Sequence, residues 1–152
     1  MARKTFNEKL NDSKSMPEII ILTDAKAIER YGGSKMLIAP PLAYDEVMKK
    51  VPEGQIITSD FIRKYLAEVN GADFTCPLTA GIFINIAANA SEERNADITP
   101  YWRTLKKDGE LNEKYPEGID GQKFHLETEG HTVIQKGKRY FVKDYESKLF
   151  KI

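Results

Sequence analysis

The chain has 152 residues, of which 41% are hydrophobic and 30% are charged, so it can bury one substantial core. Lys plus Arg and Asp plus Glu both number 23, and this balance excludes a bulk charge that would attract nucleic acid or an acidic ligand. One cysteine excludes an internal disulfide, the N-terminus lacks the apolar run of a signal peptide, and no stretch has the length of a membrane span. We therefore expect a cytoplasmic protein.

Residues 1–41 are predicted to form an annex to the main domain, which we place at 42–152. The apolar run at 18–22 predicts a buried strand or an extended arm, and residues 24–32 predict a short helix closed by glycine. Residues 35–41 are expected to be extended up to their paired prolines. The annex would pack on the domain or serve as a dimerisation arm.

A helical pattern begins at residue 43 and ends at Pro52. Ser59 is predicted to cap a second helix, and residues 70–76 are predicted to form a turn. Pro77 suits the first position of an uncharged helix over 77–90. A helix, a short turn and a helix rich in small residues are typical of a helix-turn-helix.

Downstream of this motif, residues 97–105 are predicted to be extended and residues 120–130 to be helical. Alternating apolar and polar residues flank a Lys-Gly turn at 136–137, which indicates a β-hairpin. The expected fold class is α+β and mainly helical, a winged-helix-like helix-turn-helix domain with a C-terminal β-hairpin. The alternative is that the hairpin only closes the core.

The local charge distribution is uneven. Residues 132–152 are basic, whereas residues 91–97 are acidic, which is consistent with a phosphate-facing surface or with an ordinary solvated one. The uncharged helix 77–90 contains small residues that would allow close approach to a nucleic-acid groove or to a neighbouring helix. Core packing also explains such a composition.

The sequence predicts no metal site and no cofactor. His125, His131 and the distant Cys76 lack the spacing of metal ligands, and no Gly-rich phosphate loop is present. Cys76 lies at a helix start, where a thiol can be reactive, but no histidine accompanies it in the sequence. A structural, partly buried cysteine is the other interpretation.

Several short motifs occur in an order and at spacings that resemble a known family. They are VPEGQIITS (51–59), LTAG (78–81), PYWRTL (100–105), DG (108–109), EKYPEG (113–118) and TEGH (128–131). About ninety residues resemble the DNA-binding domain of methylated-DNA-protein-cysteine methyltransferase, and especially its alkyltransferase-like relatives. The resemblance does not extend to the annex or to the final hairpin.

The resemblance places Pro100, Tyr101, Trp102 and Arg103 at the reactive motif, with Glu129 at the position of the family's glutamate. Tyr101 replaces the reactive cysteine and Trp102 replaces its histidine. Alkyl transfer from guanine requires a thiolate, and a phenol with an ordinary pKa of about 10 is a poor substitute. The resemblance therefore implies a degenerate motif with no catalytic residue.

The family's DNA-binding and base-binding positions can be carried over residue by residue. Leu78 replaces the arginine that fills the gap left by a flipped nucleotide, and Ser59 replaces the tyrosine that rotates the phosphate. The resemblance implies this set of DNA-binding residues: Ser59, Leu78, Thr79, Ala80, Gly81, Asn85 and Arg103. It implies a lesion pocket formed by Tyr101, Trp102, Tyr115 and Glu129.

The interpretation that follows is a non-catalytic DNA-binding protein of DNA repair that recognises alkylated guanine by nucleotide flipping. Its partners would be double-stranded DNA, bound through the minor groove with helix 77–90 inserted, and a repair protein. Two alternatives stay open. One is a protein-interaction module that reuses the fold, and the other is an active methyltransferase that uses Cys76.

Overall fold

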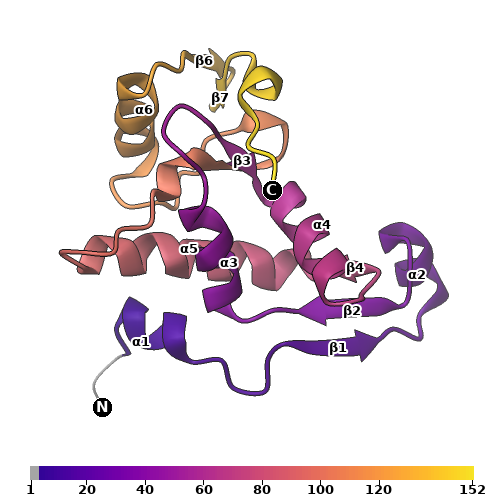
Figure 1. Ribbon diagram of the computed structural model, residues 1–152. Coiled ribbons are helices and arrows are strands. Elements are labelled where there is room, and N and C mark those ends of the chain that lie inside the picture. Colours follow the sequence, from indigo (N-terminus) through magenta and orange to yellow (C-terminus); the bar gives the residue numbers. More distant parts are fainter. Residues whose placement is uncertain (1–3) are drawn as a thin grey trace.

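The computed structural model describes residues 4–152 and has a mixed α+β architecture (Figure 1). Its helices are α1 (Phe6–Asn11), α2 (Ala25–Tyr31), α3 (Pro41–Lys49), α4 (Ser59–Val69), α5 (Pro77–Glu93) and α6 (Gly118–Thr128). Its strands are β1 (Glu18–Ile21), β2 (Lys35–Ile38), β3 (Ile57–Thr58), β4 (Phe74–Thr75), β5 (Thr104–Leu105), β6 (Val133–Lys136) and β7 (Arg139–Val142). Short 3₁₀ helices span Tyr101–Arg103, Lys107–Gly109 and Tyr145–Lys148.

Helix α5 is the central element, and α1, α3 and α4 pack against it (Figure 1). Ala80, Ile84, Ala87 and Ala88 recur at helical spacing and are buried in the main core. Their small side chains allow α3 to approach closely, since three of the four have only a methyl group. Helices α3 and α4 are therefore both held in place by packing on α5.

Strands β1 and β2, which lie in the expected annex, form a three-stranded sheet with β4 in the order β1-β2-β4. Strand β1 pairs with β2 in antiparallel fashion, and β2 pairs with β4 in parallel fashion, with Met36 opposite Phe74. The alternative of a buried strand at 18–22 is wrong, because Ile19, Ile20 and Ile21 are exposed. Strand β1 lies at the edge of the sheet, away from the main core (Figure 1).

Helix α1 lies within the expected annex and has no counterpart in the sequence predictions. The backbone N–H groups of Phe6 and Asn7 donate to the Glu93 carboxylate at 2.9 and 3.0 Å. A carboxylate at a helix N-terminus satisfies free donors and complements the helix dipole. Residues 1–3 of the expected annex lie outside the described residues.

Four local predictions need correction. Ser59 is the first residue of α4 and not its cap, because Thr58 still belongs to the parallel β3–β5 pair. The predicted turn at 70–76 contains β4, which β2 holds in the sheet. Helix α5 runs three residues beyond 90, because Glu93 binds α1. Tyr101–Arg103 is a 3₁₀ helix inside the segment expected to be extended.

A second hydrophobic cluster lies beneath the C-terminal hairpin. It contains Ile56, Leu105, Leu111, Leu126 and Val142. The hairpin β6–β7 follows the predicted alternation and register, with Val133 opposite Val142. It therefore packs on α6 and the β3–β5 pair at the end of the molecule opposite β1 (Figure 1).

Across the described chain, no helix combines the length and the apolar character that crossing a membrane requires.

Candidate functional site

A groove of about 330 Å³ lies along the N-terminal half of α5. On the helical side it is lined by Ser59, Leu78, Gly81, Ile82 and Asn85. On the other side it is lined by Lys106, Asn112, Lys114 and Tyr115. The groove brings together residues that are far apart in the sequence, because the loop after β5 returns alongside α5.

The rim of the groove exposes apolar side chains. Leu78 is 72% exposed and Ile82, one turn later, is 49% exposed. Both belong to a helix with no charged residue before Glu92, and Pro77 occupies its first turn as the sequence predicts. Leu78 and Ile82 thus form a continuous apolar edge along one side of the groove.

Polar and basic groups form the opposite wall of the groove. The Asn112 side chain donates to Asn85 Oδ1 at 3.0 Å and accepts from the Lys114 backbone N–H at 2.9 Å. Its own backbone N–H donates to buried Gln122 Oε1 at 2.7 Å. These bonds fix the loop against α5, so the wall is preorganised. Lys106 and Lys114 lie in this wall together with Glu113, whose carboxylate pairs with Lys106 Nζ at 3.1 Å, so Lys114 carries the positive charge that this pair does not balance.

Tyr101 and Tyr115 are both almost fully buried and pack against each other. They are 4% and 3% exposed, and their ring centroids lie 5.3 Å apart. The Tyr115 hydroxyl donates to the Thr104 carbonyl at 2.8 Å. Burial raises the pKa of Tyr115, and burial with nearby Glu92 and Glu117 raises the pKa of Tyr101 to about 12. Both phenols are neutral at pH 7 and unsuited to nucleophilic attack.

The Glu129 carboxylate binds both Trp102 and Arg103, the two residues that follow Tyr101. Trp102 Nε1 donates to its Oε2 at 3.0 Å, and Arg103 Nη2 donates to the same oxygen at 2.6 Å. Burial opposes the charged carboxylate, but these hydrogen bonds outweigh burial and lower the pKa of Glu129. The three side chains therefore form a fixed unit.

Arg103, which was predicted to contact DNA, is turned into the protein in this structure. Its guanidinium binds Glu129, and Nη1 donates to the Val51 carbonyl at 2.8 Å. The side chain is 14% exposed, so its charge is committed to the interior. An arginine that follows an aromatic pair gives no sequence signal for this partner, which lies 26 residues away.

The four residues of the expected lesion pocket do not line one cavity. Tyr115 lines the groove, whereas Tyr101 and Trp102 line a second hollow beside α6. Glu129 lines neither, because it is enclosed by Trp102 and Arg103. The buried Tyr101–Tyr115 contact separates the two spaces.

The remaining predicted DNA-contact residues divide between surface and core. Ser59, Leu78, Gly81 and Asn85 line the groove. Thr79 is half-buried, and its hydroxyl donates to the Cys76 carbonyl at 3.4 Å. Ala80 is buried in the core and does not line the groove.

Cys76 is the N-cap residue of α5 and is half-buried. Its backbone N–H donates to the Leu37 carbonyl at 2.9 Å, which holds it beside the sheet. Cys76 lines neither the groove nor the second hollow. The alternative of a transferase that uses Cys76 would need a histidine beside the thiol. His125 lines the second hollow and Cys76 does not, so this hollow does not bring the two residues together.

The predicted site residues did not include several that line the groove, among them Ile82, Lys106, Asn112, Glu113 and Lys114. Ile82 had a usable signal, because it lies four residues after Leu78 on the same helical face. The others lie in the loop after β5. Their place depends on the Asn85 and Gln122 contacts and has no periodic signature.

Comparison with known proteins gives structural relatives only. The chain matches no protein-family model and no curated protein. It is similar to the crystal structure of S. pombe Atl1 in complex with damaged DNA containing O6-carboxymethylguanine, with a TM-score of 0.53 and 16% identity. It is similar to S. pombe ATL in complex with DNA, with a TM-score of 0.52 and 16% identity. In both cases the match covers 74% of this chain and 94% of that chain. The fold resemblance to the alkyltransferase-like proteins that the motifs predict is thus confirmed.

Proposed function

We propose that this protein is a non-catalytic, alkyltransferase-like DNA-binding protein that recognises alkylated guanine by nucleotide flipping in DNA repair. The observation that carries the proposal is the exposed apolar edge of α5 at Leu78 and Ile82 beside the preorganised groove. The two similar structures both contain DNA, and in one of them the DNA contains O6-carboxymethylguanine. Residues 42–152 would form the binding domain, with 1–41 as its annex.

The N-terminal half of α5 would enter the minor groove of the duplex. Leu78, at the first turn, would insert between base steps as an apolar wedge and occupy the gap left by an extruded nucleotide. Unstacking costs a few kcal/mol, which an alkylated and poorly paired guanine reduces. The absence of charge along this part of α5 lets the helix approach the bases closely.

The extruded base would occupy the groove, whose volume of about 330 Å³ is sufficient for a purine. Ser59, Asn85 and Asn112 supply hydroxyl and amide groups for its polar edge. Lys106 and Lys114 would contact the flanking phosphates. The site then binds the lesion without transferring its alkyl group, since Tyr101 is buried and neutral.

The C-terminal hairpin would act as a wing on the phosphate backbone. Lys136 and Lys138 are exposed at its turn, and Lys143 is exposed after β7. Arg139 is engaged with Glu110 at 2.9 Å and is less free to contribute. A repair-protein partner would then read the marked lesion.

A titration of matched fluorescent duplexes, with and without one O6-methylguanine, tests the proposal at low and moderate salt. The lesion duplex should bind more tightly, and Leu78→Ala should weaken its binding by about tenfold through loss of the wedge. Val69→Ala, which removes an exposed apolar side chain from the end of α4, is the matched control and should bind as the wild type does. Equal affinity of Leu78→Ala and wild type for the lesion duplex would contradict the proposal.

The competing function is a protein-interaction module that reuses the fold. The zero net charge and the exposed apolar residues of α5 favour it, because neither requires DNA. In that case neither duplex should bind at low salt, where phosphate contacts are strongest. Binding at low salt that weakens with added salt would exclude this alternative.

A further inference from the structure

A second hollow, of about 480 Å³, lies at the C-terminal end of α5 against α6. The aromatic rings of Tyr101, Trp102, Phe124 and His125 line it, together with the carboxylates of Glu92 and Glu117. The groove described above uses residues 77–85 of α5, whereas the hollow uses Ser91 and Glu92. Because α5 has 17 residues and rises about 1.5 Å per residue, the two spaces lie at opposite ends of it.

The aromatic wall is preformed. Trp102 and His125 are stacked with centroids 4.2 Å apart, and buried Tyr101 meets Trp102 edge-on at 5.3 Å. The Arg103 guanidinium lies over the Trp102 ring at 5.5 Å, so the rings left to contact a cation are those of His125 and Phe124. Phe124 meets His125 at 5.8 Å but is 66% exposed, so most of its ring is free to contact a ligand. An aromatic surface that is held in place and partly uncovered is suited to a cation, which it attracts through the ring electrons.

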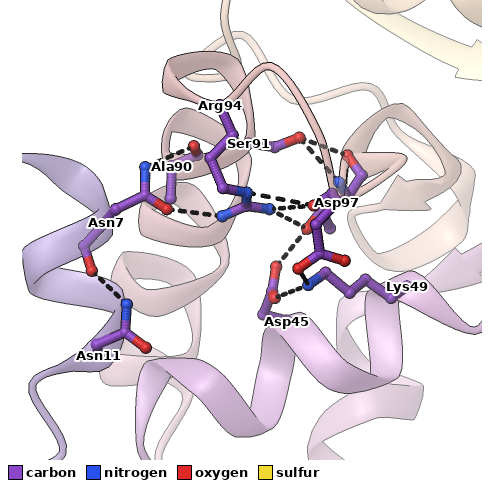
Figure 2. A network of polar contacts seen from close by, with 9 residues as sticks. Asn7, Asn11, Asp45, Lys49, Ala90, Ser91, Arg94 and Asp97 are labelled. Carbon is purple, nitrogen blue, oxygen red and sulfur yellow. Dashed lines mark hydrogen bonds and ion pairs between the residues drawn. The ribbon is translucent and has the colours of Figure 1, made fainter.

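The charge of the hollow is also suited to a cation. Within residues 4–152, neither Glu92 nor Glu117 forms an ion pair. Arg94 is the only cationic side chain in the lining. Its guanidinium donates to Asn7, to the Asp97 carbonyl and to Thr99, and Figure 2 shows it turned into that network. Two carboxylates thus remain without a positive partner beside the rings.

We propose that this hollow binds an alkylated ammonium group presented by a lysine side chain of a protein partner. Methylation of the ammonium weakens its hydration and enlarges its apolar surface, so aromatic walls hold it better than a bare ammonium. The carboxylates supply the complementary charge. An alkylated ammonium group is inferred because the hollow combines aromatic rings with unpaired carboxylates. Neither feature alone would identify this ligand.

A protein partner explains the rim of the hollow. Phe124 is 66% exposed and Ile98 is 47% exposed, and a small free cation would leave both uncovered. A peptide that carries the ammonium group would cover them with its flanking residues. The inference goes beyond the proposed DNA binding, since the groove and the hollow can be filled at the same time.

The test uses the emission of Trp102, the only tryptophan of the chain, which lines the hollow. The protein is titrated with three glycine-serine peptides that differ at one position, which is trimethyllysine, lysine or leucine. We expect the trimethyllysine peptide to bind about tenfold more tightly than the lysine peptide, with the leucine peptide weakest. Equal binding of all three peptides, or no binding of any at millimolar concentration, would overturn the inference.

Two variants test the residues. Phe124→Ala should weaken binding of the trimethyllysine peptide by about tenfold, and the double variant Glu92→Gln with Glu117→Gln by a similar factor. Glu127→Gln removes a carboxylate from α6 outside the hollow and should bind as wild type. If both variants of the hollow bind the trimethyllysine peptide with wild-type affinity, the inference is overturned. If Phe124→Ala does not fold, the double variant alone is the test, because both of its carboxylates are exposed. Lesion-duplex titration of the same variants should be unchanged, so loss of one function is distinguished from loss of the other.

Discussion

The two halves of α5 differ in what holds them. The N-terminal half exposes Leu78 and Ile82, and its neighbours leave a groove beside it. The C-terminal half buries Ala87, Ala88 and Ala90 and ends in a dense polar network (Figure 2). One helix thus has a free end and an anchored end, and the free end is where we place DNA.

The anchor connects three elements that are distant in sequence. Arg94 donates to Asn7 Oδ1 of α1 at 2.8 Å and to Thr99 Oγ1 at 3.0 Å. Thr99 in turn donates to Asp45 Oδ1 of α3 at 2.5 Å. The network fixes the loop that leads directly into Tyr101. Stability should therefore depend on the anchored end, and DNA affinity on the free end.

The largest effect is expected from Asp45→Ala. Asp45 is almost fully buried, accepts from Thr99 and faces Lys49 Nζ at 3.3 Å. Its removal takes the buried acceptor from the Thr99 hydroxyl and leaves Lys49 with only its exposed partner Asp97, so the free energy of unfolding should fall by about 3 kcal/mol. Urea denaturation measures it. Asp97→Asn is the control: it removes the ion pair of a side chain that is 77% exposed, keeps a residue type that tolerates the φ of 53° at this position, and should cost less than about 0.5 kcal/mol. A similar loss of unfolding free energy in both variants would show that the burial of Asp45 does not determine its contribution to stability.

A smaller effect, on binding and not on folding, is expected from Lys106→Ala with Lys114→Ala. Each lost phosphate contact should make the slope of log affinity against log salt less steep by about 1. The free energy of unfolding should stay within about 0.5 kcal/mol of wild type, because both lysines lie on the surface. Lys26→Ala, on the exposed α2 side of the annex, should leave the slope unchanged. A slope unaffected by the double variant would remove the groove from the DNA interface.

The smallest effect is expected from Glu129→Gln, and it concerns how the free energy of unfolding depends on pH. The folded-state pKa of Glu129 is lowered from 4.5, because the hydrogen bonds from Arg103 and Trp102 outweigh burial. The unfolded chain therefore takes up the proton first as pH falls. The stability that this carboxylate contributes is present above pH 4.5 and is lost as pH falls through the folded pKa.

Urea midpoints of wild type and Glu129→Gln between pH 7 and pH 3 check this prediction. The gap between the two proteins should be widest at pH 7 and should narrow below pH 4.5. A gap of constant width would show that the charge of Glu129 does not stabilise the folded state.

Local signals predicted the elements that depend on near neighbours. Pro77 marked the start of α5, and the Lys-Gly turn with alternating residues marked the β6–β7 hairpin. The motif order also predicted the fold resemblance that the structural relatives confirm. Each of these depends on periodicity or on spacing, which a sequence displays directly.

Distant contacts decided the features that the sequence did not predict. Helix α1 is short and is held by Glu93, 87 residues from Phe6. The commitment of Arg103 to Glu129 and the inward packing of Tyr115 depend on side chains brought together only by folding. The site was therefore predicted as a set of positions, but its division into a groove and a separate hollow was not.

Base extrusion at the free end of α5 is the central claim, and one measurement tests it most directly. A duplex with 2-aminopurine beside a single O6-methylguanine reports loss of stacking as a rise in emission. The account predicts a rise on binding of the wild-type protein and a much smaller rise with Leu78→Ala at concentrations that saturate the duplex. Saturated binding without any rise in emission would show that the protein binds DNA with the lesion still stacked, and would contradict the account.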